Sequence, residues 1–342
     1  MIGANDAQLI ARYRALGNTS EIFGDYFRVE DTVQLETKKE CLLGGYAMLT
    51  VASNGNFILA DRMMTRSVFL FNVDGQFISK IGKPGEGPGE YRDPISVTTN
   101  PANNIFVFDH SLLRIQVYGD NGIFVNSVTI NKYFDKMTIA KDGEFVFYTP
   151  IATRKEDKTR KSVFVYNGLG EEQRSFFDQP ESYAPSAPVS GGGIAIDSAN
   201  IIFCMSAYEY GLKAFTVEGD EVIVSSQMPA YFRTQKQFPN NHQKDLKALT
   251  KWYNSWTSID GLSLYKQEII VVRTSEIVDR KPVRRIDLIS RSGKILKGGI
   301  RLPDPKWTYV FANENGLFVV CENTPDTQGQ YDNPRILKFQ LR

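Results

Sequence analysis

Cysteine and histidine are scarce in this chain of 342 residues, which contains three cysteines and two histidines. Cys41, Cys204 and Cys321 are widely spaced and form no CxxC pair, so the sequence predicts neither a structural zinc site nor a disulfide framework. Because His110 and His242 are the only histidines, a metal site built from several histidines is excluded.

A strong net charge and long apolar runs are also missing. The formal net charge is +1 at pH 7, so no overall field favours nucleic acid or an anionic membrane as a partner. No apolar run approaches the roughly 18 residues that a membrane-spanning helix needs. The first residues, MIGANDAQLIARYRALG, lack the apolar core of a signal peptide, which leaves either a cytoplasmic protein or a leader that is absent from this chain.

A repeated hairpin pattern is what the sequence has in abundance. In YAMLTVASNGNFILAD (46–61), two apolar runs flank the turn signal Asn54-Gly55. Similar segments recur at 94–109, 135–149, 191–205, 257–273 and 309–321. The first five of the six copies are followed by a second hairpin, at 67–81, 114–128, 162–177, 212–226 and 285–300. Four antiparallel strands per unit of about 40–50 residues are typical of β-propeller blades.

The sixth repeat is one strand short, because the chain stops after 335–342. The segment 26–37, which precedes the first blade, can supply the missing strand, close the ring and remove an exposed sheet edge. We therefore predict an all-β fold, a single domain over 1–342 that forms a six-bladed propeller of four-stranded antiparallel blades. A seven-bladed ring or a β-sandwich is the alternative.

Two segments have helical patterns. Residues 1–25 form a predicted helical lead-in, in which Asn5 is followed by Gln8 in a capping-box spacing. Residues 228–256 form a predicted insertion between blades four and five. Its apolar residues Leu246, Leu249, Tyr253 and Trp256 recur at helical spacing, so we expect a helix within 240–256.

The glycine-rich stretch GKPGEGPGEYRDP (82–94) invites comparison with a phosphate-binding loop. Such a loop needs a helix after it, whose N-terminal amides face the anion, and here a strand follows. Pro84, Pro88 and Pro94 restrict the backbone. We interpret this stretch as a rigid connection from blade one to blade two.

This connector, with the following NIFVFDHSLLRIQVYGDNGIFV, resembles the NHL-type repeat of six-bladed propellers over roughly residues 46–128. The later blades match only in rhythm, since Thr149, Met205, Arg273 and Cys321 stand where Asp61 and Asp109 stand. The resemblance implies a bacterial envelope protein, secreted or lipid-anchored, and hence a periplasmic or cell-surface location. It implies the fold more firmly than the function.

Long connections fall on one face of the predicted propeller and tight turns on the other. The long ones are 82–94, 149–161, 178–192, 228–256, 274–284 and 322–334. Because long loops concentrate function, we expect a binding site on this face at the mouth of the central channel, with neutral drift in loop length as the alternative. Basic residues outnumber acidic ones in 149–161, 228–256 and 274–284, which is typical of solvated surface and leaves an anionic partner open.

Seven residues near that mouth are candidates for ligand contact because polar or aromatic side chains there can converge on one ligand. They are Asp61, Arg62, Tyr91, Arg92, His110, Arg114 and Tyr208. Each one could instead form an interblade salt bridge or a packing ring.

We expect a monomeric, non-enzymatic binding or scaffold protein that needs no cofactor and recognises a carbohydrate, a peptide or another protein. Nucleic acid is not expected, because the basic residues lack regular aromatic interleaving. The alternative is a calcium-assisted hydrolase or lyase with Asp61, Asp109 and Glu322 as metal ligands. Those aspartates could equally be turn residues that accept backbone N–H bonds. No nucleophile–base pair stands out, so no catalytic residue is assigned.

Overall fold

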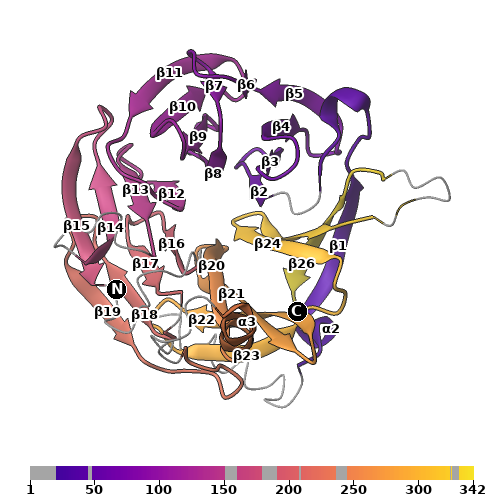
Figure 1. The fold of residues 1–342 in the computed structure, drawn as a ribbon, viewed down its shortest axis with the longest axis vertical. Helices are drawn as coiled ribbons and strands as arrows, with labels where there is room; N and C mark the ends of the chain where they lie inside the picture. Colours follow the sequence, from indigo (N-terminus) through magenta and orange to yellow (C-terminus); the bar gives the residue numbers. More distant parts are fainter. Residues whose placement is uncertain are drawn as a thin grey trace. The chain divides into compact units, whose positions relative to one another are not determined.

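The computed structural model describes residues 21–44, 48–150, 160–178, 191–207, 209–235, 245–323, 325 and 331–342. These residues form an all-β, six-bladed propeller of four-stranded antiparallel sheets (Figure 1). The fold class predicted from the hairpin repeat is confirmed.

The strands follow the predicted repeat. Blade one contains β2 (Met48–Val51), β3 (Phe57–Asp61), β4 (Ser67–Phe71) and β5 (Phe77–Ile81). Blade two contains β8 (Pro94–Thr99), β9 (Ile105–Asp109), β10 (Arg114–Tyr118) and β11 (Phe124–Thr129). Blade three contains β12 (Lys136–Ile139), β13 (Phe145–Tyr148), β14 (Lys161–Tyr166) and β15 (Glu172–Asp178).

The later blades keep the same order. Blade four contains β16 (Gly193–Ile196), β17 (Ile202–Met205), β18 (Leu212–Phe215) and β19 (Glu221–Ser225). Blade five contains β20 (Ser258–Tyr265), β21 (Ile269–Val278), β22 (Lys281–Ser290) and β23 (Ile295–Arg301). Blade six contains β24 (Trp307–Asn313), β25 (Gly316–Cys321), β26 (Arg335–Leu341) and β1 (Phe27–Gln34).

The chain forms two compact units, which are described separately. The first unit contains the described parts of 1–26, 148–163 and 174–305, and the second contains those of 27–147, 164–173 and 306–342. That residues 1–342 make a single domain stays a prediction.

Burial in the second unit explains why the strands do not alternate strictly between apolar and polar residues. The second strands β3 and β9 are buried along their whole length, whereas the last strands β5 and β11 are partly exposed. One core cluster joins Ile58 and Leu70 of blade one to Ile105 and Val107 of blade two. Because neighbouring blades pack on both faces of a middle strand, both of its faces must be apolar.

The predicted closing strand is present in the second unit. β1 pairs antiparallel with β26, from Phe27 opposite Leu341 to Gln34 opposite Arg335, and it is the outermost strand of blade six. The fully buried Asn333 fastens the chain that follows β1. Its Nδ2 donates to the carbonyl oxygens of Glu36 (2.7 Å) and Cys41 (2.9 Å), and its Oδ1 accepts from Leu43 N (2.8 Å).

The connector at 82–94 folds back on itself. Two short strands in it, β6 (Lys83–Pro84) and β7 (Glu90–Tyr91), pair in parallel. Glu90 stabilises the turn between them, because its carboxylate accepts from Gly87 N at 2.8 Å and pairs with Lys83 at 3.1 Å. The Gly87 amide and the Lys83 ammonium accordingly lower the pKa of Glu90. The connector from blade one to blade two is therefore a folded turn, and its rigidity stays a prediction.

Replacing Gly89 by valine should lower the free energy of unfolding by at least ~1 kcal/mol, because its φ of +71° disfavours any residue with a Cβ. A Cβ there would also lie 3.1 Å from Cγ of Phe124. Gly87 has no such φ and is the matched control, for which Gly87→Val should cost less. Urea denaturation of both variants measures the difference, and equal costs would contradict a backbone role for Gly89.

The two predicted helical segments are described only in part. In the first unit, α2 covers Phe23–Tyr26, and residues 1–20 of the predicted lead-in lie outside the described residues. The helix of the 228–256 insertion is α3 (Leu246–Tyr253), which Asp245 caps by accepting from Lys247 N and Ala248 N. The start of the predicted helix at 240–244 is outside the described part, and Trp256 lies beyond its end. All three cysteines are buried, and none of them forms a disulfide.

Candidate functional site

Four ionisable side chains of the second unit lie close together beyond the ends of strands in blades one, two and three. Arg62 and His110 directly follow the second strands β3 and β9. Asp93 and Asp135 directly precede the first strands β8 and β12 of the next blade along the chain. Arg62 and His110 hold equivalent positions in blades one and two, and Asp93 and Asp135 hold equivalent positions in blades two and three. The repeat therefore places a basic residue after a second strand and a carboxylate before the first strand of the next blade.

Asp93 is the central residue of this group, because it contacts both Arg62 and His110. The Arg62 guanidinium binds its carboxylate in a bidentate fashion, with Nε 2.6 Å from Oδ1 and Nη2 2.9 Å from Oδ2. His110 Nδ1 lies 3.6 Å from Asp93 Oδ2, and the His110 amide donates to the Asp93 carbonyl oxygen at 3.0 Å. The edge of the His110 ring contacts Tyr133, with ring centroids 5.1 Å apart. We call Arg62, Asp93, His110, Tyr133 and Asp135 the Asp93 cluster.

The two carboxylates of the cluster have opposite electrostatic properties. Burial by itself would raise the pKa of Asp93, but His110 and Arg62 outweigh burial and hold this pKa well below its usual range. Burial raises the pKa of Asp135, and the charges of Lys136, His110 and Arg62 only partly offset that rise. The cluster thus combines a carboxylate with a lowered pKa and one with a raised pKa.

Asp61 and Asp109 are part of the backbone framework around the cluster. Both are buried, and their carboxylates accept hydrogen bonds of 2.6–3.3 Å from main-chain amides. The donors to Asp61 are Gly44, Met64 and Thr65, and those to Asp109 are Arg92, Asp93, Ser111 and Leu112. A calcium ion would have to compete with these donors for the same oxygen lone pairs. Among the residues that the structure describes, no three His, Cys, Asp or Glu side chains group as metal ligands.

The remaining candidates lie in different surroundings. Tyr91 is fully buried, where its hydroxyl donates to Ile81 O at 2.6 Å and accepts from Val68 N at 2.9 Å, so we leave it out of the site. The Glu86 side chain pairs with Arg92 on the surface of the connector. Arg114 donates to the Glu86 carbonyl oxygen at 3.0 Å.

Two further candidates remain, Tyr208 and Glu322. Tyr208 lies outside the described residues. Glu322 lies in blade six just after β25, where its amide donates to Lys306 O at 3.0 Å.

Sequence reasoning missed Asp93, Tyr133 and Asp135, although a signal was there. An aspartate directly precedes the first strand in both blades two and three, at the position that faces the residue after the second strand of the preceding blade. Comparing the repeats position by position would have paired Arg62 with Asp93 and aligned His110 with Asp135.

The chain matches one family of unknown function and shares its fold with several solved structures. A family model described as a domain of unknown function, DUF4934, matches residues 18–272. The resemblance to the NHL-type repeat predicted the correct fold, but membership of the NHL family is not confirmed. No curated protein matches the sequence.

Solved structures share the fold at low sequence identity. A "putative exported protein" from Bacteroides fragilis NCTC 9343 has a TM-score of 0.66 at 15% identity, covering 95% of this chain and 97% of that chain. A member of the DUF4221 family from Bacteroides vulgatus ATCC 8482 has a TM-score of 0.68 at 12% identity, covering 92% and 98%. Virginiamycin B lyase from Staphylococcus aureus has a TM-score of 0.51 at 11% identity, covering 92% and 100%. Likeness at these identities shows the fold alone.

No helix in the described ranges is both long and apolar enough to span a bilayer.

Proposed function

Because the chain belongs to the DUF4934 family, whose function is unknown, we propose a function from the site itself: a non-enzymatic propeller that binds a hydroxyl-rich ligand of the carbohydrate class. The Asp93 cluster is the binding site in this proposal. The observation that carries it is a bidentate Arg62–Asp93 pair that lies beside an exposed aromatic ring.

The pair supplies directional polar contacts. Two N–H groups of Arg62 are used on Asp93, which leaves three donors of the guanidinium for a ligand. Asp93 and His110 add acceptor and donor capacity, and the side chains of all three are partly exposed. Because Arg62 and Asp93 hold each other in place, little side-chain entropy is lost when a ligand binds.

Tyr133 supplies the apolar contact that a sugar ring needs. Its side chain is 43% exposed, and its orientation is restrained by the edge contact with His110. An aromatic face next to a few convergent polar groups is the usual composition of a small-molecule site. A peptide or protein partner would use a larger surface, and these partners are the competing outcomes of the experiment below.

Location and assembly follow the same proposal. The likeness to an exported Bacteroides protein supports a periplasmic or cell-surface location for this chain. We propose that the protein acts as a monomer, at the face that carries the blade-to-blade connections.

Alanine substitution of Arg62 should weaken glycan binding at least about tenfold, because it removes charge-assisted bonds and leaves the half-buried Asp93 without its partner. The wild-type protein is first screened on an array of neutral and acidic oligosaccharides. The affinity for the best ligand is then measured by isothermal titration calorimetry for the wild type, Arg62→Ala and Tyr133→Ala.

The matched control is Arg114→Ala, which removes an arginine that contacts the connector backbone outside the cluster. It should bind as the wild type does. If Arg62→Ala lowered thermal stability while all glycan affinities stayed unchanged, the cluster would be an interblade ion pair and not a binding site. If the wild type consumed a glycan or lactone in the same assay, the enzymatic alternative would replace this proposal.

A further inference from the structure

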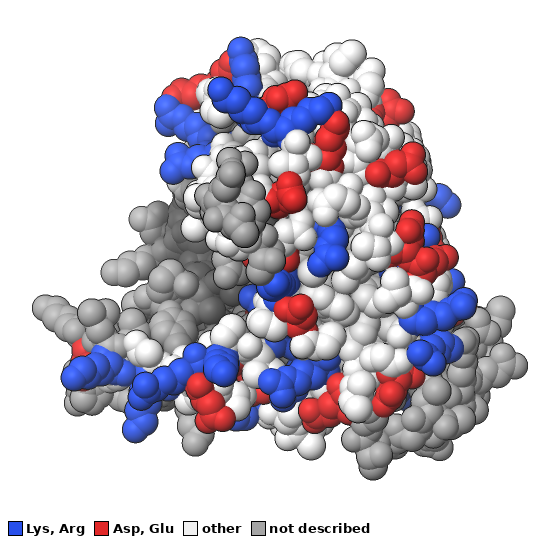
Figure 2. Space-filling view, turned by 90° about the vertical axis from the view of Figure 1, so that its right-hand side faces the viewer, with Lys and Arg blue, Asp and Glu red and all other residues white. Residues whose placement is uncertain are grey.

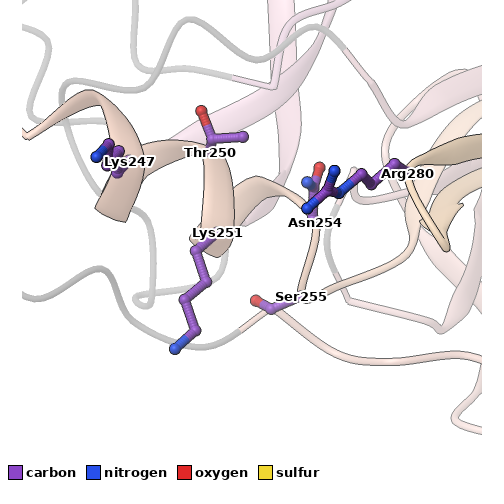
Figure 3. A pocket seen from close by; sticks show the side chains of 6 residues that line it. All are labelled: Lys247, Thr250, Lys251, Asn254, Ser255 and Arg280. Atoms are coloured by element: carbon purple, nitrogen blue, oxygen red, sulfur yellow. The ribbon is translucent and has the colours of Figure 1, made fainter.

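A second polar site lies in the first unit, between α3 and the turn that joins β21 to β22. A pocket of about 720 Å³ is lined there by Lys247, Thr250, Lys251, Asn254, Ser255 and Arg280 (Figure 3). This volume is within the usual range of pockets that hold small ligands. The pocket belongs to a different element set from the Asp93 cluster, and nothing in the function proposed above uses it.

The helix presents one polar stripe to this pocket. Lys247, Thr250, Lys251 and Asn254 are spaced three or four residues apart, so they share one face of α3. The adjacent face is anchored, because Trp252 is buried and its ring lies 5.7 Å from that of Trp256. Packing of the tryptophans therefore fixes which face of the helix lines the pocket.

Arg280 reaches the pocket from the opposite side. Val278 pairs with Lys281, so Asp279 and Arg280 are the two central residues of a tight turn, and both have positive φ (49° and 63°). Turns of this kind strongly favour glycine or asparagine at the second central position. An arginine there is held in a strained backbone conformation, and Figure 3 shows its side chain extended toward Asn254.

The residues that line the pocket include three cations and no carboxylate. α3 contains no acidic residue, and the two carboxylates next to it in the chain and in the turn do not line the pocket. They are Asp245, whose Oδ1 caps the helix, and Asp279, which precedes Arg280. In contrast, Arg233 and Arg285 nearby in the same unit both pair with the buried Glu276. No carboxylate of the described residues lines the pocket or forms an ion pair with Lys247, Lys251 or Arg280. On the face in Figure 2, Lys and Arg gather at the top and toward the lower left, and Asp and Glu lie among them.

We propose that this pocket binds a sugar-sized molecule that carries two or more sulfate or phosphate ester groups. Three cations placed around one concavity match several negative charges better than one. The planar guanidinium of Arg280 can bind two oxygens of a tetrahedral oxyanion, and the two lysines act as point charges. The Asn254 side chain is an additional hydrogen-bonding group at the same wall.

The experiment measures binding of three defined probes to the full chain by isothermal titration calorimetry. Sucrose octasulfate and inositol hexakisphosphate represent the sulfate and the phosphate source, and citrate is the carboxylate comparison. We expect one of the two esters to bind clearly more tightly than citrate, and its affinity to fall as ionic strength rises. Lys251→Ala and Arg280→Ala should each weaken that binding about tenfold, as for the loss of one charge-assisted contact.

Lys281→Ala is the matched control, because it removes an equal charge from the exposed residue next to Arg280 that does not line the pocket. It should bind the ester as the wild type does. Equal weakening by Lys281→Ala would overturn the site in favour of a general surface charge effect. Failure of both esters to bind the wild type, or citrate binding as tightly as they do, would overturn the ligand class. Arg62→Ala should leave this binding unchanged, so the result is independent of the Asp93 cluster.

Discussion

Deletion of residues 1–37 is expected to leave a protein that aggregates and has no single cooperative unfolding transition. The deletion removes β1, which covers β26 along its whole length. The uncovered β26 would present a row of unpaired N–H and C=O groups, which is a template for pairing with another chain. Size-exclusion chromatography and thermal melting monitored by circular dichroism measure the outcome.

A peptide of residues 21–37 should restore solubility when it is added in trans, because β1 can re-pair with β26 by strand addition. A peptide with the same composition in scrambled order is the control, since it lacks the apolar residues at the right register. If the truncated protein stayed monomeric and melted cooperatively without any peptide, β1 would not be needed to complete blade six.

A point substitution tests the same closure without removing a strand. Asn333→Ala should lower the free energy of unfolding by several kcal/mol, because Glu36 O, Cys41 O and Leu43 N each lose a buried partner that is worth roughly 1–3 kcal/mol. The neighbouring Asn323→Ala is the control. Its side chain is only partly buried and donates to Asn333 O and Gln34 Oε1, so about 1 kcal/mol is expected.

The fold could be predicted from the sequence because its signals are local. Asn54-Gly55 and Asp74-Gly75 predicted hairpin turns, and both glycines have the positive φ that such turns require. The closing strand was predicted by counting strands, which needs only the repeat and the requirement that sheet edges be covered. The predicted segment 26–37 differs from β1 by a few residues at its ends.

The candidate site could be predicted only in part, because its contacts join neighbouring blades. Arg62 and His110 were identified because each follows the second strand of a repeated hairpin pattern. Their partner Asp93 was not identified from the sequence. Tyr91 was placed among the ligand contacts because an aromatic residue in a loop has the same sequence signature whether it faces solvent or the core. In the structure Tyr91 is completely buried. Its hydroxyl donates to the carbonyl oxygen of Ile81 and accepts from the amide of Val68, so its polar group is satisfied inside the protein.

The buried hydrogen-bonding role of Asp287 could not be predicted from the sequence either, because its partners come from other strands and loops. It lies in RIDLIS, which reads as an ordinary strand with one polar residue. In the structure its Oδ2 accepts from the hydroxyls of Tyr210 (2.8 Å) and Tyr231 (2.7 Å), and its Oδ1 accepts from Gly299 N (2.6 Å). None of these donors is close to Asp287 in the chain except Gly299, so only the tertiary fold brings them together.

Substituting Asp287 by alanine should destabilise the protein severely. The Tyr210 hydroxyl and the Gly299 amide would each lose a buried acceptor, at roughly 1–3 kcal/mol each, which is a large part of the 5–15 kcal/mol that stabilises a typical domain. The partly buried Tyr231 hydroxyl would lose one partner and keep its contact with Thr274 Oγ1. Urea denaturation at pH 7 measures the loss. The exposed turn residue Asp220 is the control, and Asp220→Ala should change the midpoint little.

Asp287→Asn is expected to change how stability depends on pH, which separates the effect of the charge from that of the hydrogen bonds. Burial raises the pKa of Asp287 from 3.8 to about 6, although Gly299 and the two tyrosines partly offset this. The folded protein therefore holds a proton between these two pH values that the unfolded chain has lost. The stabilisation from this group is complete below about pH 4, falls as pH rises through 6, and is constant above that.

The shift of about two pKa units corresponds to roughly 3 kcal/mol across that window. Asparagine does not titrate, so the variant should gain stability relative to the wild type by about this amount between pH 4 and pH 8. Urea denaturation of both proteins over that range gives the difference directly, and other titrating groups cancel because they are common to both. A difference between the two proteins that did not change with pH would show that Asp287 has the same protonation state in the folded and unfolded chains.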